Sequence, residues 1–272
     1  MTGKDFTTLK QAAVSWWMKS NIWIELTRNL AVRDVEYRYK HSALGLYWAL
    51  INPLLTATIF GFVFAVIFHA NSKPLPYPIF LLTGLTFWNF FANSVMSAMT
   101  SITGNGALLA KIYFPRIVLP TASVIARSID FMFSMVILLL FILLYHVPIA
   151  WTIIWVPVIF ILQIIFTLGI SYVVASLNVF FRDMSQLMGL VLMVWVYLSP
   201  VMYSLRTQNP MLQDILWLNP MGTYIEMERN LMFDGHLSHP LFLIPAVGAA
   251  LFSFVIGKIV FNRLEKMFAE VM

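Results

Sequence analysis

The chain contains no cysteine in 272 residues, and only 11% of its residues are charged. Without cysteine the protein has no disulfide, no catalytic thiolate and no cysteine-ligated metal. Soluble domains carry roughly 25% charged residues, whereas 60% of this chain is hydrophobic. A soluble fold of this length would expose apolar patches that soluble monomers rarely tolerate. The composition therefore predicts an integral membrane protein.

The sequence also lacks a G-x-x-x-x-G-K-[ST] phosphate-binding loop, because Gly3-Lys4 and Gly257-Lys258 have neither the earlier glycine nor the following Ser or Thr. We expect no ATP binding by this route, so any use of ATP would depend on a partner subunit. The five histidines fall at expected helix boundaries and predict no metal site. The first forty residues lack a short apolar core followed by a small-residue cleavage site, so we expect no cleaved signal peptide.

Charge-free windows predict the membrane spans, because charges are costly in hydrocarbon and a helix needs about 20 residues to cross. Asp, Glu, Lys and Arg are all absent from residues 41–72, 74–110, 131–181, 184–205 and 235–257. The third window is long enough for two crossings with a turn at His146-Val147-Pro148. The expected fold is an all-α transmembrane domain over residues 41–272. Its six spans are expected at about 44–69, 77–100, 120–146, 149–177, 185–205 and 240–261.

Lys and Arg predict the orientation, because they accumulate on the cytoplasmic side. With the N-terminus inside, cytoplasmic segments hold Lys4, Lys10, Lys19, Arg28, Arg33, Arg38, Lys40, Lys111, Arg116, Arg182, Lys258, Arg263 and Lys266. External segments hold Lys73, Arg206 and Arg229, and Arg127 lies within a span. We therefore expect a multi-pass protein with both termini in the cytoplasm. The net charge of +5 reflects this bias rather than nucleic-acid binding.

Residues 1–40 form the expected cytoplasmic N-terminal segment. Within it, Trp23, Leu26 and Leu30 recur at helical spacing while charged residues occupy other faces. This pattern predicts an amphipathic helix over residues 20–40 that lies in the membrane interface. The alternative is a basic tail that only follows the charge bias.

Two connecting segments have unusual compositions. The cytoplasmic segment 101–119 contains Thr103-Gly104-Asn105-Gly106 before a short apolar and basic stretch, which predicts a turn and a brief helix. The external segment 206–239 is too apolar for a solvated loop. We expect short re-entrant helices there, whose backbone must be satisfied by protein or water.

Arg127 and Asp130 are the ionisable residues well inside an expected span. Their separation of three residues places them on one helix face. Intramembrane charges are candidates for function, yet this pair lies near the cytoplasmic start of the third span, where Arg can reach the interface. The sequence leaves open a structural ion pair and a role at the entrance for cargo.

Aromatic residues make up 15% of the chain. Channel-lining candidates are Phe60 and Phe64 in the first expected span, and Trp195, Tyr197 and Ser199 in the fifth. Rings can stack on the C–H faces of sugars, while Tyr and Ser hydroxyls can meet sugar hydroxyls. Ordinary helix packing is the alternative for each of these rings.

Three passages of the chain, taken together, carry a resemblance to a known protein family. The first is Arg33-Asp34-Val35, Arg38-Tyr39-Lys40-His41-Ser42-Ala43-Leu44-Gly45, Trp48 and Asn52-Pro53-Leu54. The second is Lys111-Ile112-Tyr113-Phe114-Pro115-Arg116 with Leu119-Pro120. The third is Asn178-Val179-Phe180-Phe181-Arg182-Asp183 with Ser199-Pro200-Val201 and Leu218-Asn219-Pro220. In this order, over about residues 30–235, they resemble ABC-2 type permeases that export O-antigen, capsule or teichoic acid, and the O-antigen type most closely.

The resemblance implies a homodimeric permease in a bacterial plasma (inner) membrane, bound to two copies of a cytoplasmic ATPase that carries MgATP. The cargo would be a polyprenyl-diphosphate-linked, O-antigen-like polysaccharide that moves outward through a channel between the two permeases. The chain itself would be a permease subunit without catalytic residues, metal, cofactor or nucleic-acid partner.

The resemblance also implies roles for individual residues. The loop that couples to the ATPase would contain Asn105, Leu108, Lys111, Tyr113, Phe114, Pro115 and Arg116. The interface helix and cytoplasmic entry would contain Arg33, Asp34, Arg38, Tyr39 and Lys40, whose positive charges could attract a diphosphate or anchor lipid headgroups. The outer gate would contain Trp217, Asn219, Pro220, Tyr224 and Arg229.

Other functions stay open at this level. A related permease could carry a teichoic acid, a capsule polysaccharide or a smaller amphiphile. A membrane-embedded glycosyltransferase or acyltransferase would need carboxylates or a histidine that converge near a membrane face, and outside the Arg127–Asp130 pair the sequence offers only the isolated Asp183. A gated channel would need a ring of charges or carbonyls, and none is evident.

Overall fold

The computed structural model describes residues 23–40, 47–63, 75–109, 114–181, 183–203, 218–237, 241 and 243–268. Within these ranges the regular secondary structure is helical, which confirms the expected all-α fold.

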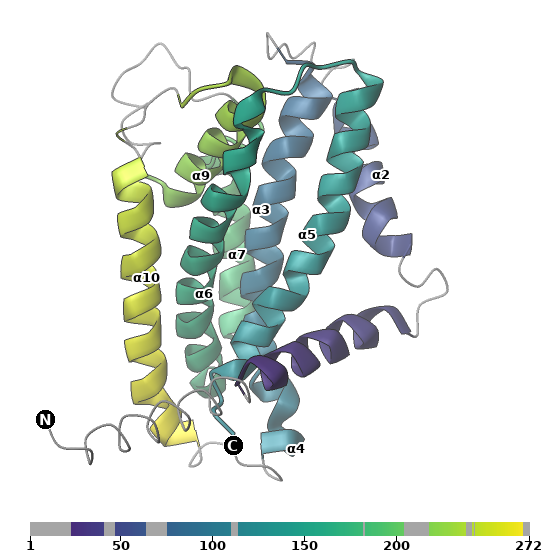
Figure 1. The fold of residues 1–272 in the computed structure, drawn as a ribbon. Helices are drawn as coiled ribbons and strands as arrows, with labels where there is room; N and C mark the ends of the chain where they lie inside the picture. Colours follow the sequence, from purple (N-terminus) through teal and green to yellow (C-terminus); the bar gives the residue numbers. More distant parts are fainter. Residues whose placement is uncertain are drawn as a thin grey trace, which may run out of the picture.

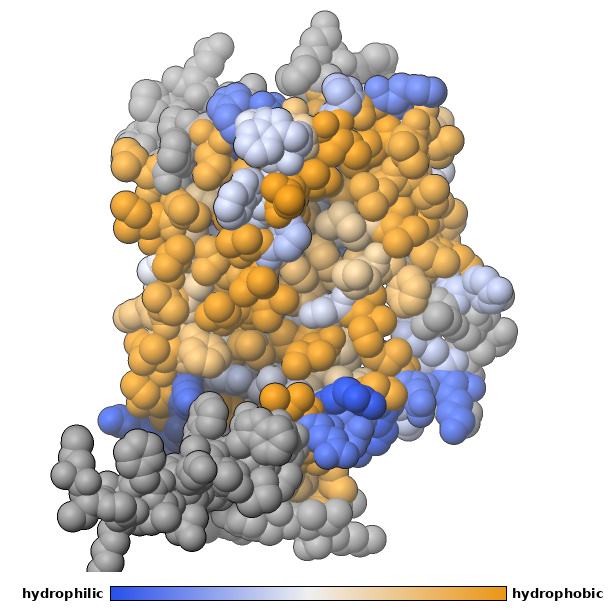
Figure 2. Space-filling model, in the orientation of Figure 1, coloured by the Kyte–Doolittle hydropathy of each residue, from blue (hydrophilic) through white to orange (hydrophobic). Residues whose placement is uncertain are grey.

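Four helices are long and apolar enough to cross a membrane. They are α3 (Tyr77–Thr100), α5 (Val118–Leu144), α6 (Val156–Phe180) and α10 (Leu243–Leu264), and they run roughly parallel to one another (Figure 1). Figure 2 shows a broad hydrophobic belt with hydrophilic residues above and below it. These helices coincide with the second, third, fourth and sixth expected spans.

Two shorter apolar helices occupy the first and fifth expected spans. They are α2 (Trp48–Phe62) and α7 (Met184–Leu198), with 15 residues each. A helix needs about 20 residues to cross, so six spans stay a prediction. The helix α7 ends at Leu198, and Ser199 after it has an extended backbone because the next residue is Pro200.

The expected turn between the third and fourth spans is confirmed. The helix α5 ends at Leu144, and His146 then adopts a left-handed conformation with φ of 54°. After Pro148 a 3₁₀ turn, Trp151–Trp155, leads into α6. The amide of Ala150 donates to the carbonyl of Met232 at 2.9 Å, so this turn is held to a segment far along the chain.

Residues 23–40 form a helix, here called the N-terminal helix, that crosses one end of the bundle nearly transverse to the long helices (Figure 1). We call this end the lower end and the opposite one the upper end. Leu30 and Ala31 are buried in a cluster with Val118 and Ala122 of α5. The expected amphipathic helix is therefore present and lies against the start of α5.

The helix α3 is central, since 78% of its most apolar window is buried, compared with 22% for α5 and for α10. Its rings Phe87 and Phe90 pack with Phe131 of α5 and Phe160 of α6, and the last two rings stack at 4.0 Å. On the other side of α6, Gly169 and Gly257 allow α10 to approach so closely that a methyl group on either would overlap the opposing backbone.

Candidate functional site

At the lower end, Asp130 of α5 joins the N-terminal helix to the bundle. Its carboxylate accepts hydrogen bonds from Arg38, from the Tyr39 hydroxyl at 2.8 Å and from Arg127 at 3.2 Å. Arg38 also pairs with Asp34 at 3.7 Å. The ion pair that the sequence suggested on α5 is therefore part of a cluster of two arginines and two aspartates.

This junction is partly shielded from solvent. The side chains of Arg38, Arg127 and Asp130 are 18%, 25% and 23% exposed. Ion pairs at such depth depend on their partners, because an uncompensated charge is costly there. Burial, together with the hydrogen bond to Asp130, raises the pKa of Tyr39 to about 12. The Tyr39 hydroxyl therefore stays a donor to the carboxylate throughout the physiological range.

The N-terminal helix also contacts the segment that follows α3. Arg33 donates to the Asn105 side chain at 2.6 Å, and Asn105 in turn donates to the carbonyl of Ser101 at 2.8 Å. Asn105 ends a 3₁₀ turn, Thr103–Asn105, that leads directly into the short helix α4 (Gly106–Leu109). Arg33, expected at the cytoplasmic entry, is thus hydrogen-bonded to Asn105, which was expected in the coupling loop.

A polar cavity of about 600 Å³ lies beside this contact. It is lined by Arg33, Asp34, Tyr37, Ser97, Thr100, Ser101, Gly104, Asn105 and Ser123. Hydroxyl and charged groups predominate, so this space suits water or a polar headgroup rather than an acyl chain. Lys40 is exposed at the end of the same helix.

The remaining residues of the expected coupling loop are held in different ways. Lys111 and Tyr113 lie outside the described residues. Leu108 and Phe114 pack against the hydrophobic cluster that contains Leu30 and Val118. Pro115 is half-buried. Arg116 donates to the carbonyl of Glu265 at 3.1 Å and lies over the Phe268 ring. Arg116 therefore fastens this loop to the end of α10 instead of projecting freely.

At the upper side, Asn219 connects the end of α7 to the start of α9 (Pro220–Arg229). Its oxygen accepts from Trp195 Nε1 at 2.9 Å and from the Met221 amide at 3.2 Å. Its nitrogen donates to Ser199 Oγ at 2.8 Å and to the Leu198 carbonyl at 3.1 Å. The expected short helix in the external segment is present, and Asn219 caps it.

The channel-lining candidates do not share one surface. Trp195 packs edge-on against Phe91 with ring centroids 5.1 Å apart, and Ser199 is fully buried. Tyr197, on the opposite face of α7, is 61% exposed, and Phe60 of α2 is 37% exposed. Phe64 lies outside the described residues. Packing thus accounts for Trp195 and Ser199, while Tyr197 and part of the Phe60 ring lie at the surface.

Arg229, expected in an external gate, is buried in the interior. Its guanidinium donates to Glu226 at 3.2 Å and to the carbonyls of Pro200 and Phe80 at 3.1 Å each, and it lies 3.6 Å from the centroid of the Phe80 ring. Gly84 makes this possible, because a methyl group there would lie 2.8 Å from the guanidinium. In the sequence, the three-residue spacing of Glu226 and Arg229 was the available sign that Arg229 pairs within its own helix.

The other outer-gate residues fix α9 in place. Tyr224 is fully buried and its hydroxyl donates to the Ala246 carbonyl of α10 at 2.6 Å. Pro220 is the first residue of α9, and Trp217 lies outside the described residues. All residues of α9 from Met221 to Arg229 are buried. Movement of this helix would require these hydrogen bonds to break or rotate together.

In the described part of the chain, no group of three or more His, Asp or Glu side chains could hold a metal ion. The two ends instead show hydrogen-bonded contacts between helices that are distant in the sequence.

Comparison with known proteins agrees with this architecture. Residues 25–233 match the family model described as ABC-2 type transporter. The O-antigen export system permease protein RfbA of Klebsiella pneumoniae is 32% identical over 241 residues, which cover 88% of this chain and 92% of that protein. The protein of the same name from Myxococcus xanthus is 31% identical over 227 residues, 82% of this chain and 86% of that protein.

A more distant relative is the polysialic acid transport protein KpsM of Escherichia coli, which is 23% identical over 251 residues, 87% of this chain and 92% of that protein. The resemblance noted in the sequence is confirmed by these matches, which extend over most of the chain. The chain belongs to the ABC-2 type transporter family.

Proposed function

We propose that this chain is the membrane permease of an exporter that moves a lipid-linked, O-antigen-like polysaccharide from the cytoplasmic to the outer side of the plasma membrane. The similarity to O-antigen export permeases over 88% of the chain carries this proposal. ATP would be hydrolysed by a separate nucleotide-binding subunit, because the chain has no phosphate-binding loop of its own.

The functional unit would be a permease homodimer with two ATPase subunits. The exposed apolar surface of α7 supports a partner, since Leu192 is the one buried residue that the helix contains. A bundle with four long spans is too small to enclose a wide channel alone. A second copy beside α2 and α7 would place the exposed Phe60 and Tyr197 near the shared interface.

The lower end would face the cytoplasm and receive the ATPase. A shift of the segment 101–116 would reach the N-terminal helix through Asn105 and Arg33, and then α5 through Asp130. The same segment is tied to α10 through Arg116. Each contact converts local movement into a change in helix position, which is what coupling to transport requires.

Export of a capsule polysaccharide is the second candidate, and the 23% identity to KpsM favours it. Both candidates predict the same assembly and differ in the glycan.

Co-expression with the candidate nucleotide-binding subunits, followed by purification, tests the assembly. We expect a stable complex of two permeases and two ATPase subunits that hydrolyses ATP. Deletion of the permease gene should leave lipid-linked glycan inside the cell, detected by surface labelling against total glycan. A permease that purifies alone and hydrolyses no ATP with any subunit would overturn the proposal.

A further inference from the structure

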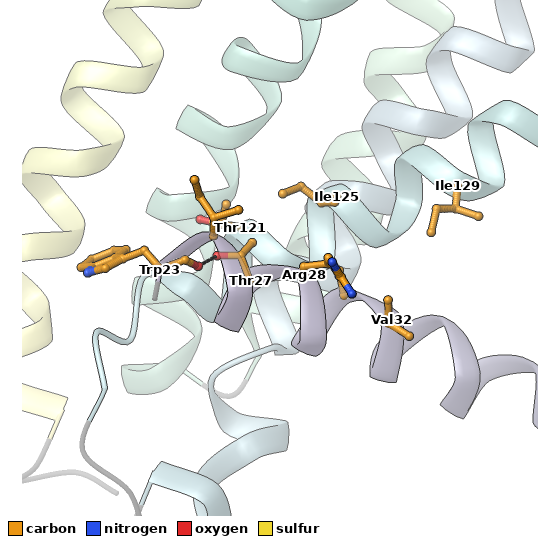
Figure 3. Close-up of a pocket in the computed structure, with 9 residues that line it drawn as sticks. Trp23, Thr27, Arg28, Val32, Thr121, Ile125 and Ile129 are labelled. Atoms are coloured by element: carbon orange, nitrogen blue, oxygen red, sulfur yellow. Dashed lines mark hydrogen bonds between the residues drawn. The ribbon is translucent and has the colours of Figure 1, made fainter. Parts of the chain in front are cut away.

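An apolar groove lies between the N-terminal helix and α5, on the side away from the polar cavity. It is open to the outside and has a volume of about 500 Å³. Figure 3 shows the side chains around this space. Its lining residues are Trp23, Ile24, Thr27, Arg28, Ala31, Val32, Thr121, Ile125 and Ile129.

The groove offers almost no hydrogen-bonding groups. The Thr27 hydroxyl donates to the carbonyl of Trp23 at 2.7 Å. The Thr121 hydroxyl donates to the carbonyl of Ile117 at 2.8 Å and also bonds to the Tyr172 hydroxyl at 2.9 Å. Both hydroxyls in the lining are therefore occupied. Water or a sugar would find few partners here, whereas a hydrocarbon chain would bury apolar surface.

Large apolar side chains in the lining are open to the outside. Trp23 is 41% exposed, Ile125 is 42% exposed and Ile24 is more exposed than either. An apolar patch on a protein surface marks an interaction site. Ile125 belongs to the third turn of a helix that is apolar enough to cross the membrane, so the patch lies where acyl chains meet the bundle.

Arg28 is the charged residue in the lining. Among the described residues, none forms a hydrogen bond or ion pair with its guanidinium, and Glu25 one turn earlier does not pair with it. An arginine can lay its aliphatic stem along apolar surface while its guanidinium binds a phosphate through two parallel hydrogen bonds. The groove thus combines an apolar channel with a cation at its rim that has no partner among the described residues.

We propose that this groove binds an anionic phospholipid of the cytoplasmic leaflet, with an acyl chain between the two helices and the phosphate on Arg28. Charge complementarity selects the headgroup, because Arg28 is the charged side chain in the groove lining and a guanidinium pairs with a phosphate. This site goes beyond the proposed function and does not depend on which cargo is exported.

The lipid would complete the attachment of the N-terminal helix. Hydrogen bonds hold its second half, where Arg38 and Tyr39 bind Asp130, whereas its first half packs on α5 through Leu30. The first half, from Trp23 to Val32, is the part that borders the groove. A bound lipid would fill the space that the protein leaves there and hold this half of the helix at a set distance from α5.

Quenching of Trp23 fluorescence by lipids with brominated acyl chains tests the site directly. The full chain, with its ATPase subunit, is placed in phosphatidylcholine nanodiscs that contain a small fraction of brominated phosphatidylglycerol or of brominated phosphatidylcholine. The Trp23 signal is the difference between the unmodified chain and Trp23→Phe, because the chain has nine tryptophans. We expect quenching by the anionic lipid at about fivefold lower mole fraction, the factor that one basic side chain contributes at an anionic surface.

Two variants and their matched controls locate the site. Arg28→Gln should abolish the preference for the anionic lipid, and Arg263→Gln, at an exposed position on α10 outside the groove, should keep it. Ile125→Phe should fill the groove and reduce the quenching, whereas Ile161→Phe, at an exposed position on α6, should not.

Equal quenching by both lipids would identify ordinary boundary lipid and overturn the proposal. Absence of any Trp23 quenching would also overturn it, because the groove would then be closed by protein, such as a second copy of the chain. Both readings come from the unmodified protein and Trp23→Phe, so a failure of Arg28→Gln to fold would not leave the question open.

Discussion

Asp130 shows at the scale of one residue how the lower junction depends on charge. It is the shared acceptor for Arg38, Tyr39 and Arg127. Without its carboxylate the two arginines would face each other across a partly buried space. The sequence indicated Arg127 as a partner three residues away, but Arg38 is 92 residues away in the chain.

Replacement of Asp130 by Asn should therefore destabilise the protein strongly. Removal of one member of a buried charged cluster costs about 3–5 kcal/mol, because the remaining charges are left uncompensated. Tyr39→Phe removes a single neutral donor and should cost about 1 kcal/mol. The thermal unfolding midpoints of purified Asp130→Asn and Tyr39→Phe compare these two losses of stability. Equal losses would show that the charges of the two arginines are already solvated in the native protein.

The two glutamates of α9 should respond differently to neutralisation. Glu226 accepts from Arg229, whereas the oxygens of the fully buried Glu228 have no hydrogen-bond partner among the described residues. A buried carboxyl without a partner is expected in its neutral form. Glu228→Gln should therefore change stability by less than about 1 kcal/mol, while Glu226→Gln should cost about 3 kcal/mol by leaving Arg229 without its carboxylate.

Unfolding midpoints of Glu226→Gln and Glu228→Gln, measured side by side in the same lipid or detergent, decide this prediction. A larger loss for Glu228→Gln would mean that Glu228 is ionised and has a partner beyond the described residues.

At the scale of secondary structure, close approach of backbones holds α10 to α6. A methyl group on Gly169 would overlap the backbone of Ser253, and one on Gly257 would overlap the backbone of Gly169. Small residues allow such contacts in membranes, where helices associate by packing rather than by a hydrophobic driving force. The sequence contains the glycines but does not reveal which of them face another helix.

Gly169→Ala and Gly257→Ala should force the two helices apart, at a cost of about 1–3 kcal/mol for overpacking. The controls are Gly189→Ala and Gly248→Ala, because open space surrounds both positions and alanine favours the helix. The yield of monodisperse protein on size-exclusion chromatography, together with the unfolding midpoint, should fall only for the first pair. A normal yield of Gly169→Ala would show that the helices can separate without loss.

The connection between α7 and α9 depends on the hydrogen bonds of the Asn219 side chain. Asn219→Ala removes four hydrogen bonds, and one of them is the helix cap, which is worth about 1 kcal/mol by itself. Asn219→Asp keeps the acceptor for Trp195 but loses both donors. We expect stability to decrease from the native chain to Asp to Ala, with export falling in the same order.

Thermal unfolding and surface labelling of exported glycan measure this order for Asn219. Full export by Asn219→Ala would exclude this connection from the transport path.

For the whole molecule, the lower end is where movement of the ATPase would enter the permease. Arg33 and Asn105 join the N-terminal helix to the segment before α4. Arg33→Gln and Asn105→Ala should each reduce ATP-driven export while ATP hydrolysis continues, because the contact transmits movement and takes no part in the chemistry. Since they break the same contact, the double variant should be no worse than either single variant.

Export and ATPase activity of the four proteins, measured in one preparation, form this double-mutant cycle. Additive losses would show that the two residues act separately, and the proposed route of coupling would then be wrong.

The long spans follow from the sequence because a helix in hydrocarbon must carry few charges along its length. This local requirement predicted the ends of α3, α5 and α10 to within three residues and those of α6 to within seven, as well as the turn at His146. The unusual apolar character of the external segment likewise predicted short re-entrant helices, and one short helix, α9, is present there. The ABC-2 family pattern was also present in short passages of the chain.

Tertiary structure decided where the polar side chains go. Arg229, expected outside, lies in the interior because Gly84 leaves room and the carbonyls of Phe80 and Pro200 accept its hydrogen bonds. Arg38 binds Asp130, and Trp195 binds Asn219, only because the helices bring them together. Charge and hydropathy act along the chain and can be read from it, whereas these partners are selected by packing between segments that the sequence keeps apart.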